Sequence, residues 1–65
     1  MHEPYIVTVT LTLPAYQALA LAQFVTHADF DDYLLHARDR LEALHMHAAG
    51  QILRAALARA GYAPR

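Results

Sequence analysis

The chain has 65 residues, no cysteine and a formal net charge of −1 at pH 7, and 57% of its residues are hydrophobic. A chain of this length forms one domain, residues 1–65, and as a monomer it buries only about 60% of the surface that its unfolded form exposes. Without cysteine it has neither disulfides nor thiolate metal ligands, so oligomerisation is the common remaining route to stability. The near-neutral charge disfavours DNA as a partner, because phosphate contacts require an excess of basic groups.

Charge is distributed unevenly along the chain. Residues 1–42 contain six acidic residues and two arginines, a net charge of −4, whereas residues 43–65 contain three arginines and no acid. Acids favour helix starts and arginines favour helix ends, which accounts for much of this pattern. The same asymmetry would let two copies packed head to tail complement each other.

Residues 4–26 carry no charged side chain and are long enough to span a bilayer. Threonines, glutamines and Pro14 nevertheless interrupt the apolar run, and no Lys or Arg precedes it to set an orientation or to form the basic region of a signal peptide. We therefore expect no membrane association and a cytoplasmic protein. The absence of cysteine fits a reducing compartment.

Residues 5–13 alternate apolar and hydroxylated side chains, with the period of two that is typical of a half-buried strand. No other stretch repeats this pattern, so the strand would have no partner within its own chain, and its backbone groups require one. We therefore predict that two copies pair their strands, and that proline at Val9 or Thr10 abolishes folding and dimerisation together. The apolar side chains of this predicted dimer ribbon are Val7, Val9, Leu11 and Leu13.

Two helical segments are predicted directly after the strand. The first, residues 14–26, begins at Pro14, which suits the first turn because its missing N–H would have no partner there. The second, residues 31–37, follows a break in which Asp29 or Asp31 can cap the new helix.

A longer helix is predicted over residues 39–60, after a break near Arg38, although one continuous helix from residue 31 to residue 60 is the alternative. Gly61 would end it in the left-handed conformation. Gly50 lies inside it, which indicates either a bend or the close approach of another backbone. Its two apolar flanks require two partners, and the main flank consists of Leu41, Leu44, Ala48, Ile52 and Ala55.

Together these elements predict an α+β fold that is mostly helical. One N-terminal strand is followed by two or three helices, and the strand pairs between the chains of a homodimer.

Catalytic and metal-binding candidates are few, and we expect neither an enzyme nor a cofactor or metal site. Serine and cysteine are both absent, which removes the usual nucleophiles. Asp31 and Asp32 suit a helix cap better than acid–base chemistry. No two histidines have the i, i+4 spacing of a metal pair on a helix, so solvated surface positions are expected for His2, His27, His36, His45 and His47.

The order strand, helix, helix, with the entry Thr-Leu-Thr-Leu-Pro at residues 10–14, resembles the ribbon-helix-helix fold. This resemblance implies a DNA-binding repressor or antitoxin, in which the outward strand residues Thr8, Thr10 and Thr12 would contact bases. The strand carries no Arg, Lys, Asn or Gln, which are the usual base-reading side chains. DNA binding is therefore the alternative function.

Residues 17–24, Gln-Ala-Leu-Ala-Leu-Ala-Gln-Phe, and the ending over residues 54–65 resemble an uncharacterised family of very small proteobacterial proteins found on phages and plasmids. The resemblance implies an accessory protein of a mobile element and carries no activity with it.

The leading prediction is a small non-catalytic homodimer that binds a host protein, as a mobile-element accessory or inhibitory protein. Tyrosines are enriched at interfaces because they combine apolar area with a polar tip. The candidate partner or DNA face consists of Thr8, Thr10, Thr12, Tyr33, Arg54 and Arg59.

Overall fold

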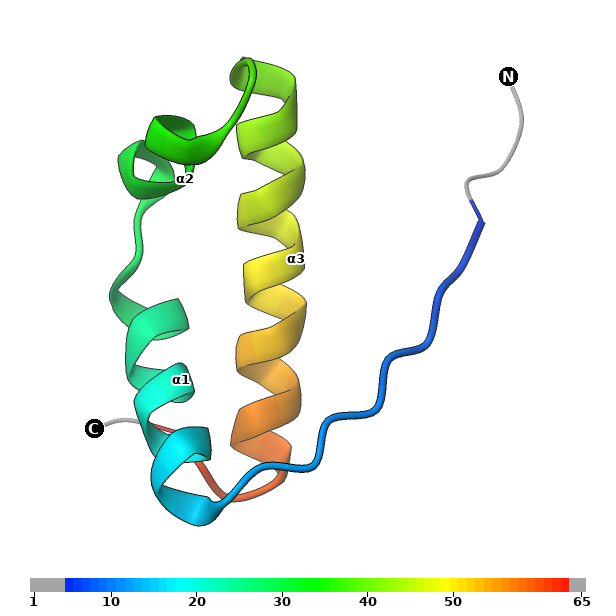
Figure 1. The fold of residues 1–65 in the computed structure, drawn as a ribbon, viewed down its shortest axis with the longest axis vertical. Coiled ribbons are helices and arrows are strands. Elements are labelled where there is room, and N and C mark those ends of the chain that lie inside the picture. Colours follow the sequence, from blue (N-terminus) through cyan, green and yellow to red (C-terminus); the bar gives the residue numbers. More distant parts are fainter. Residues whose placement is uncertain (1–4, 64–65) are drawn as a thin grey trace.

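The computed structural model describes residues 5–63, which contain three helices. Figure 1 shows the first helix antiparallel to the third. The first two helices follow each other along one side of the third, so the helices form a single layer. The lower half of the third helix therefore packs against the first helix and its upper half against the second. The helices are α1 (Ala15–His27), α2 (Phe30–His36) and α3 (Arg40–Arg59).

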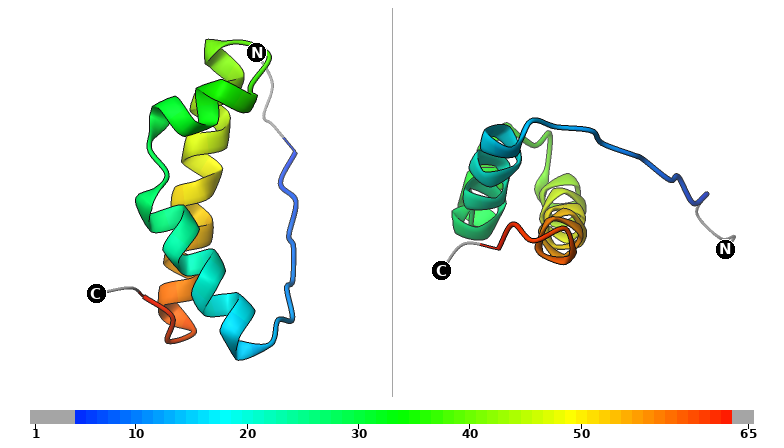
Figure 2. Two further views of the ribbon diagram at one scale, coloured as in Figure 1. Left: turned by 60° about the vertical axis from the view of Figure 1, so that its left-hand side comes forward. Right: turned by 90° about the horizontal axis from the view of Figure 1, so that it is seen from below.

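The predicted strand over residues 5–13 is wrong, and with it the α+β class, because residues 5–63 are helical and contain no strand or sheet. These residues instead form an extended segment, here called the arm, which leaves the start of α1 and diverges from the helices (Figures 1 and 2). Alternation and β-branched residues favour an extended backbone. A strand also requires a hydrogen-bonded neighbour, and no described segment of this chain supplies one.

Backbone and side-chain caps begin the first two helices. The carbonyl of Pro14 accepts the N–H groups of Gln17 and Ala18, each at 3.0 Å, and the helix expected over 14–26 runs from Ala15 to His27. In α2, the N–H of Asp32 donates to the side chain of Asp29, and the N–H of Asp29 donates to the side chain of Asp32. This reciprocal capping box satisfies two donors that the helix itself cannot pair.

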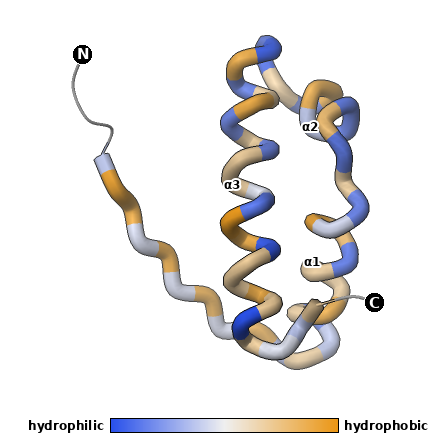
Figure 3. The backbone as a smooth tube through the Cα atoms, turned by 180° about the vertical axis from the view of Figure 1, so that it is seen from behind, coloured by the Kyte–Doolittle hydropathy of each residue, from blue (hydrophilic) through white to orange (hydrophobic). Residues whose placement is uncertain are grey.

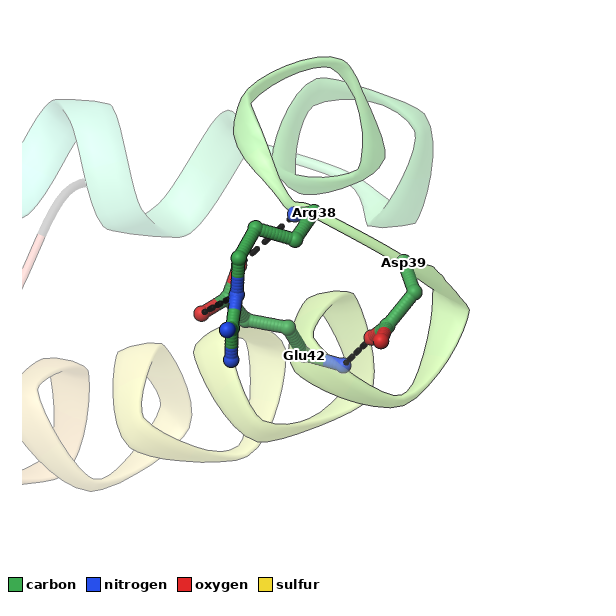
Figure 4. Close-up of polar contacts among 3 residues, drawn as sticks. All are labelled: Arg38, Asp39 and Glu42. Carbon is green, nitrogen blue, oxygen red and sulfur yellow. Dashed lines mark hydrogen bonds and ion pairs between the residues drawn. The ribbon is translucent and has the colours of Figure 1, made fainter.

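The start of α3 is fixed by Arg38 and Asp39, in the turn that separates it from α2, and by Glu42 in its own first turn (Figure 4). The N–H of Glu42 donates to Oδ1 of Asp39 at 2.8 Å. The Glu42 carboxylate reaches back past Asp39 and accepts both the N–H of Arg38, at 2.7 Å, and its Nε, at 3.3 Å. The break near Arg38 is thus stabilised by the same carboxylate that begins the helix.

The end of α3 is a Schellman motif. Gly61 has φ +99°, which L side chains rarely adopt. The N–H of Tyr62 donates to the carbonyl of Leu57 at 2.8 Å and that of Gly61 to the carbonyl of Ala58 at 3.0 Å. This turn brings Tyr62 back against the core beside Leu57.

The core between α1 and α3 is small. Three α1 residues, Ala18, Ala22 and Val25, are buried together with Leu57 of α3. Ala43 is buried between α2 and α3. The surrounding residues that are half-buried against the core are Leu13, Leu21, Leu53 and Tyr62. Because most of its members are alanine, the core brings helix backbones close together but hides little apolar area from water.

We expect the variant Thr10→Pro to fold with its helices intact. In the described part of the chain no backbone hydrogen bond joins the arm to another segment, so proline removes no bonded donor there. The free energy of unfolding should change by about 0.5 kcal/mol or less, as for other exposed positions. Far-UV circular dichroism and a thermal melt would check this, and loss of cooperative unfolding would contradict the unpaired arm.

Gly61→Ala should lower the free energy of unfolding by about 1–2 kcal/mol, because alanine is strained at positive φ. Ala63→Gly is a suitable control in the same tail. A chemical-denaturation series would measure both variants, and equal stability of Gly61→Ala and the parent protein would show that the Schellman turn is not required.

Candidate interaction surface

The apolar side chains of the arm are largely exposed. Val7, Val9 and Leu11 expose 78%, 72% and 54% of their surface, and only Leu13 is half-buried against the core. The alternation of apolar and polar residues along the arm is visible in Figure 3. The three threonines between them, Thr8, Thr10 and Thr12, are exposed as well. The predicted dimer-ribbon residues thus lie on one chain segment. Of these, Val7, Val9 and Leu11 are not covered by any other part of the described chain.

A second exposed apolar surface runs along α3 on the side away from α1 and α2. We call it the outer face and define it by the residues of the main flank found in the sequence. Three large members, Leu41, Leu44 and Ile52, expose 62%, 50% and 72% of their surface. At 100° per residue Leu41 and Ile52 lie about half a turn, and Leu44 about a third of a turn, from the buried stripe of Ala43, Gly50 and Leu57. The full outer face is Leu41, Leu44, Ala48, Ile52 and Ala55, all of them exposed.

The arm and α3 together form an open apolar groove. Its walls are the side chains of Val7, Val9 and Leu11 on one side and of Ile52 and neighbouring α3 residues on the other. The groove continues past Leu11 toward the C-terminal end of α3. Side chains that line its central part are Val7, Val9, Leu11, Ala49, Ile52, Leu53 and Ala56.

Tyr33, a candidate partner residue, lies between α2 and α3 with its side chain half-buried. Its ring meets the ring of His47 edge to face, with centroids 5.7 Å apart. Its hydroxyl lies against Gly50, where a Cβ atom would overlap it. This hydroxyl is buried and has no hydrogen-bond partner among the described residues. Gly50 is therefore closely approached, but by a side chain of α2 and not by the second backbone that the sequence suggested.

Arg54 and Arg59 are exposed in the C-terminal part of α3, whereas the threonines predicted on the same face lie on the arm. Neither forms an ion pair within residues 5–63, where Arg38 pairs with Glu42 and Arg40 lies 5.0 Å from the centre of the Phe30 ring. The acidic side chains gather around the starts of α2 and α3. The described chain therefore has an acidic end and a basic end, as the sequence indicates.

The histidines do not gather into a site. Within the described residues no group of three or more His, Cys, Asp or Glu side chains could hold a metal ion. His27 and His36 line a shallow hollow between α1 and α2, together with Phe24 and Leu35. His2 lies outside the described residues.

Among residues 5–63 no helix has both the length and the apolar character needed to cross a membrane.

The fold and these surfaces define a class: a very small helical protein with a thin core and an apolar arm and outer face left uncovered. The whole chain, residues 1–65, matches the model of a family of unknown function, DUF7706. The protein belongs to that family, which agrees with the resemblance to an uncharacterised family of small proteins. Comparisons with curated proteins and with solved structures gave no match.

The Tyr33–Gly50 contact predicts the sign of two substitutions. Gly50→Ala should lower the free energy of unfolding by about 1–3 kcal/mol through overpacking. The higher helix propensity of alanine would by itself raise the free energy of unfolding by up to about 1 kcal/mol. Tyr33→Phe removes a buried hydroxyl that has no partner, and should raise the free energy of unfolding by about 1 kcal/mol.

In the double variant Gly50→Ala/Tyr33→Phe the main overlap is gone, so much of the lost stability should return. Gln51→Ala, at the adjacent exposed position of α3, is the matched control and should change little. Thermal melts of the four variants measure the coupling, and a higher midpoint for Gly50→Ala alone would refute the contact.

Proposed function

We propose that the protein is a small, non-catalytic homodimer that acts by binding another protein. The observation that carries this proposal is the apolar surface left uncovered by one copy, which consists of the arm and the outer face of α3.

The total exposed area of the chain supports self-association. The chain exposes 5596 Å², whereas a folded monomer of 7.3 kDa is expected to expose roughly 4,200 Å². One copy is thus less compact than an ordinary monomer of its mass. Large contiguous apolar patches on small proteins usually mark interaction sites.

The expectation of a binding role, not a catalytic one, rests on the residues available for chemistry. Serine and cysteine are absent from the chain, and the aspartates of the helix starts, Asp29 and Asp39, are engaged in caps. The hollows of the described chain are shallow and mostly apolar, which suits contact with a protein better than with a polar substrate.

For the partner, we propose a host protein, with this chain as a cytoplasmic accessory or inhibitory protein of a mobile element. Support for the mobile-element context comes from the resemblance of residues 17–24 and 54–65 to small phage and plasmid proteins. Exposed Arg54, distant from the acidic helix starts, is the polar contact we assign to that partner.

DNA binding stays the alternative prediction. No strand occurs among residues 5–63 to form a ribbon, and the net charge of −1 provides little attraction to phosphates. Affinity for duplex DNA that falls steeply with salt concentration would favour this alternative over a protein partner.

Light scattering coupled to gel filtration tests the homodimer. The expected result is a single species with twice the 7.3 kDa mass of the chain. A monodisperse 7.3 kDa species at micromolar concentration would overturn the proposal.

Two neighbouring arm positions test whether the apolar side of the arm is used. Val9→Asp should weaken the dimer by about 1.5–3 kcal/mol, the value of burying one such side chain, which is at least a tenfold rise in Kd. Thr10→Asp introduces the same charge on the other side of the arm and should have a much smaller effect. Equal effects of the two variants would show that charge alone is responsible.

A further inference from the structure

We propose that the second copy docks antiparallel on the outer face of α3, with the two Ala48 side chains meeting at the twofold axis. Each arm then lies along the partner's α3. This inference rests on the proposed homodimer and names the surface through which it would form.

The spacing along the outer face suits a second helix. Leu41, Ala48 and Ala55 are seven residues apart, so they form a nearly straight line along α3, and Leu44 and Ile52 flank that line. Side chains at such a spacing interdigitate with those of a facing helix. The alanine at the centre lets the two backbones approach closely.

The sizes of these side chains favour the antiparallel orientation. With Ala48 on the axis, Leu41 of each copy faces Ala55 of the other, and Leu44 faces Ile52. Large residues then meet small ones at both ends of the seam. In a parallel pair the two Leu41 side chains would face each other, and so would the two Ala55 side chains. One end of the seam would then be crowded and the other would contain a void.

Charge favours the same orientation. Arg54 and Arg59 stand without an acid near the C-terminal end of α3, and Arg59 lies on the outer face one turn beyond Ala55, while the opposite end holds Asp39 and Glu42 together with Arg38 and Arg40. An antiparallel partner keeps the two arginine-only ends apart. A parallel partner would instead place arginines beside arginines.

The arm explains how one docking event covers both exposed surfaces. In Figure 2 the arm passes beyond α3 on the side away from α1, so the space between arm and α3 is open. Ile52 belongs both to the outer face and to the wall of this space, so a helix seated on the outer face borders the arm at Ile52 and can meet Val7, Val9 and Leu11 there. These contacts involve side chains alone and need no backbone ladder. By symmetry each copy both supplies an arm and receives one.

Single-cysteine variants test this register, because the parent chain contains no cysteine. The variants are Ala48→Cys, Leu41→Cys and Ala55→Cys, each oxidised under mild conditions and analysed on non-reducing gels. Ala48→Cys should cross-link almost completely as a covalent dimer. Leu41→Cys and Ala55→Cys should cross-link poorly alone and efficiently when mixed, because an antiparallel seam joins positions 41 and 55. Ala20→Cys, an exposed alanine on α1, is the matched control and should remain largely uncross-linked.

The outcomes separate the two proposals. A parent protein that light scattering shows to be monomeric overturns both. A dimeric parent in which Ala48→Cys cross-links no better than Ala20→Cys overturns the seam and leaves the homodimer standing. Efficient cross-linking of Leu41→Cys and of Ala55→Cys each with itself would establish a parallel pair and overturn the antiparallel register.

Discussion

Close approach of helix backbones through small side chains is the contact on which the rest of this structure depends. Ala18 and Ala22 of α1 and Ala43 and Gly50 of α3 line the inner side of the layer, and Gly50 admits the Tyr33 ring of α2. Such packing gives well-defined geometry from few atoms. Small side chains also bury little apolar surface, so the hydrophobic contribution to the stability of one copy is small.

That constraint accounts for the distribution of the large apolar residues. A single layer can bury only the inner stripe of α3, and the leucines and isoleucine of the opposite stripe therefore remain at the surface. The exposed area is thus a consequence of the one-layer arrangement and does not indicate a poorly folded chain. The precise helix starts at Asp29 and Asp39 indicate that local structure is well specified.

The sequence predicts features that depend on neighbours along the chain. The break near Arg38, a helix cap at Asp29 and the left-handed Gly61 follow from local rules of helix geometry, and the structure has all three. At Gly50 the neighbour is the Tyr33 side chain and not the predicted second backbone. The strand could not be excluded in this way, because alternation specifies an extended backbone while pairing depends on a neighbour elsewhere. Likewise, α3 has two apolar flanks, and periodicity alone does not say which one meets α1. In the sequence the flank of Leu41 and Ile52 is the main one, whereas the structure buries the flank with Gly50, whose small size is what admits Tyr33.

The order of the helices has a kinetic consequence. Each helix packs on α3 within 65 residues through short connections, so the contacts that define the layer are close in sequence and their closure costs little chain entropy. Helical chains of this kind fold on microsecond to millisecond timescales, and the arm takes part in those contacts only through Leu13. Formation of the layer is then a first-order process whose rate is independent of protein concentration. Any step that covers the arm with another molecule is second-order, so in dilute solution the helices would be complete well before the arm is covered.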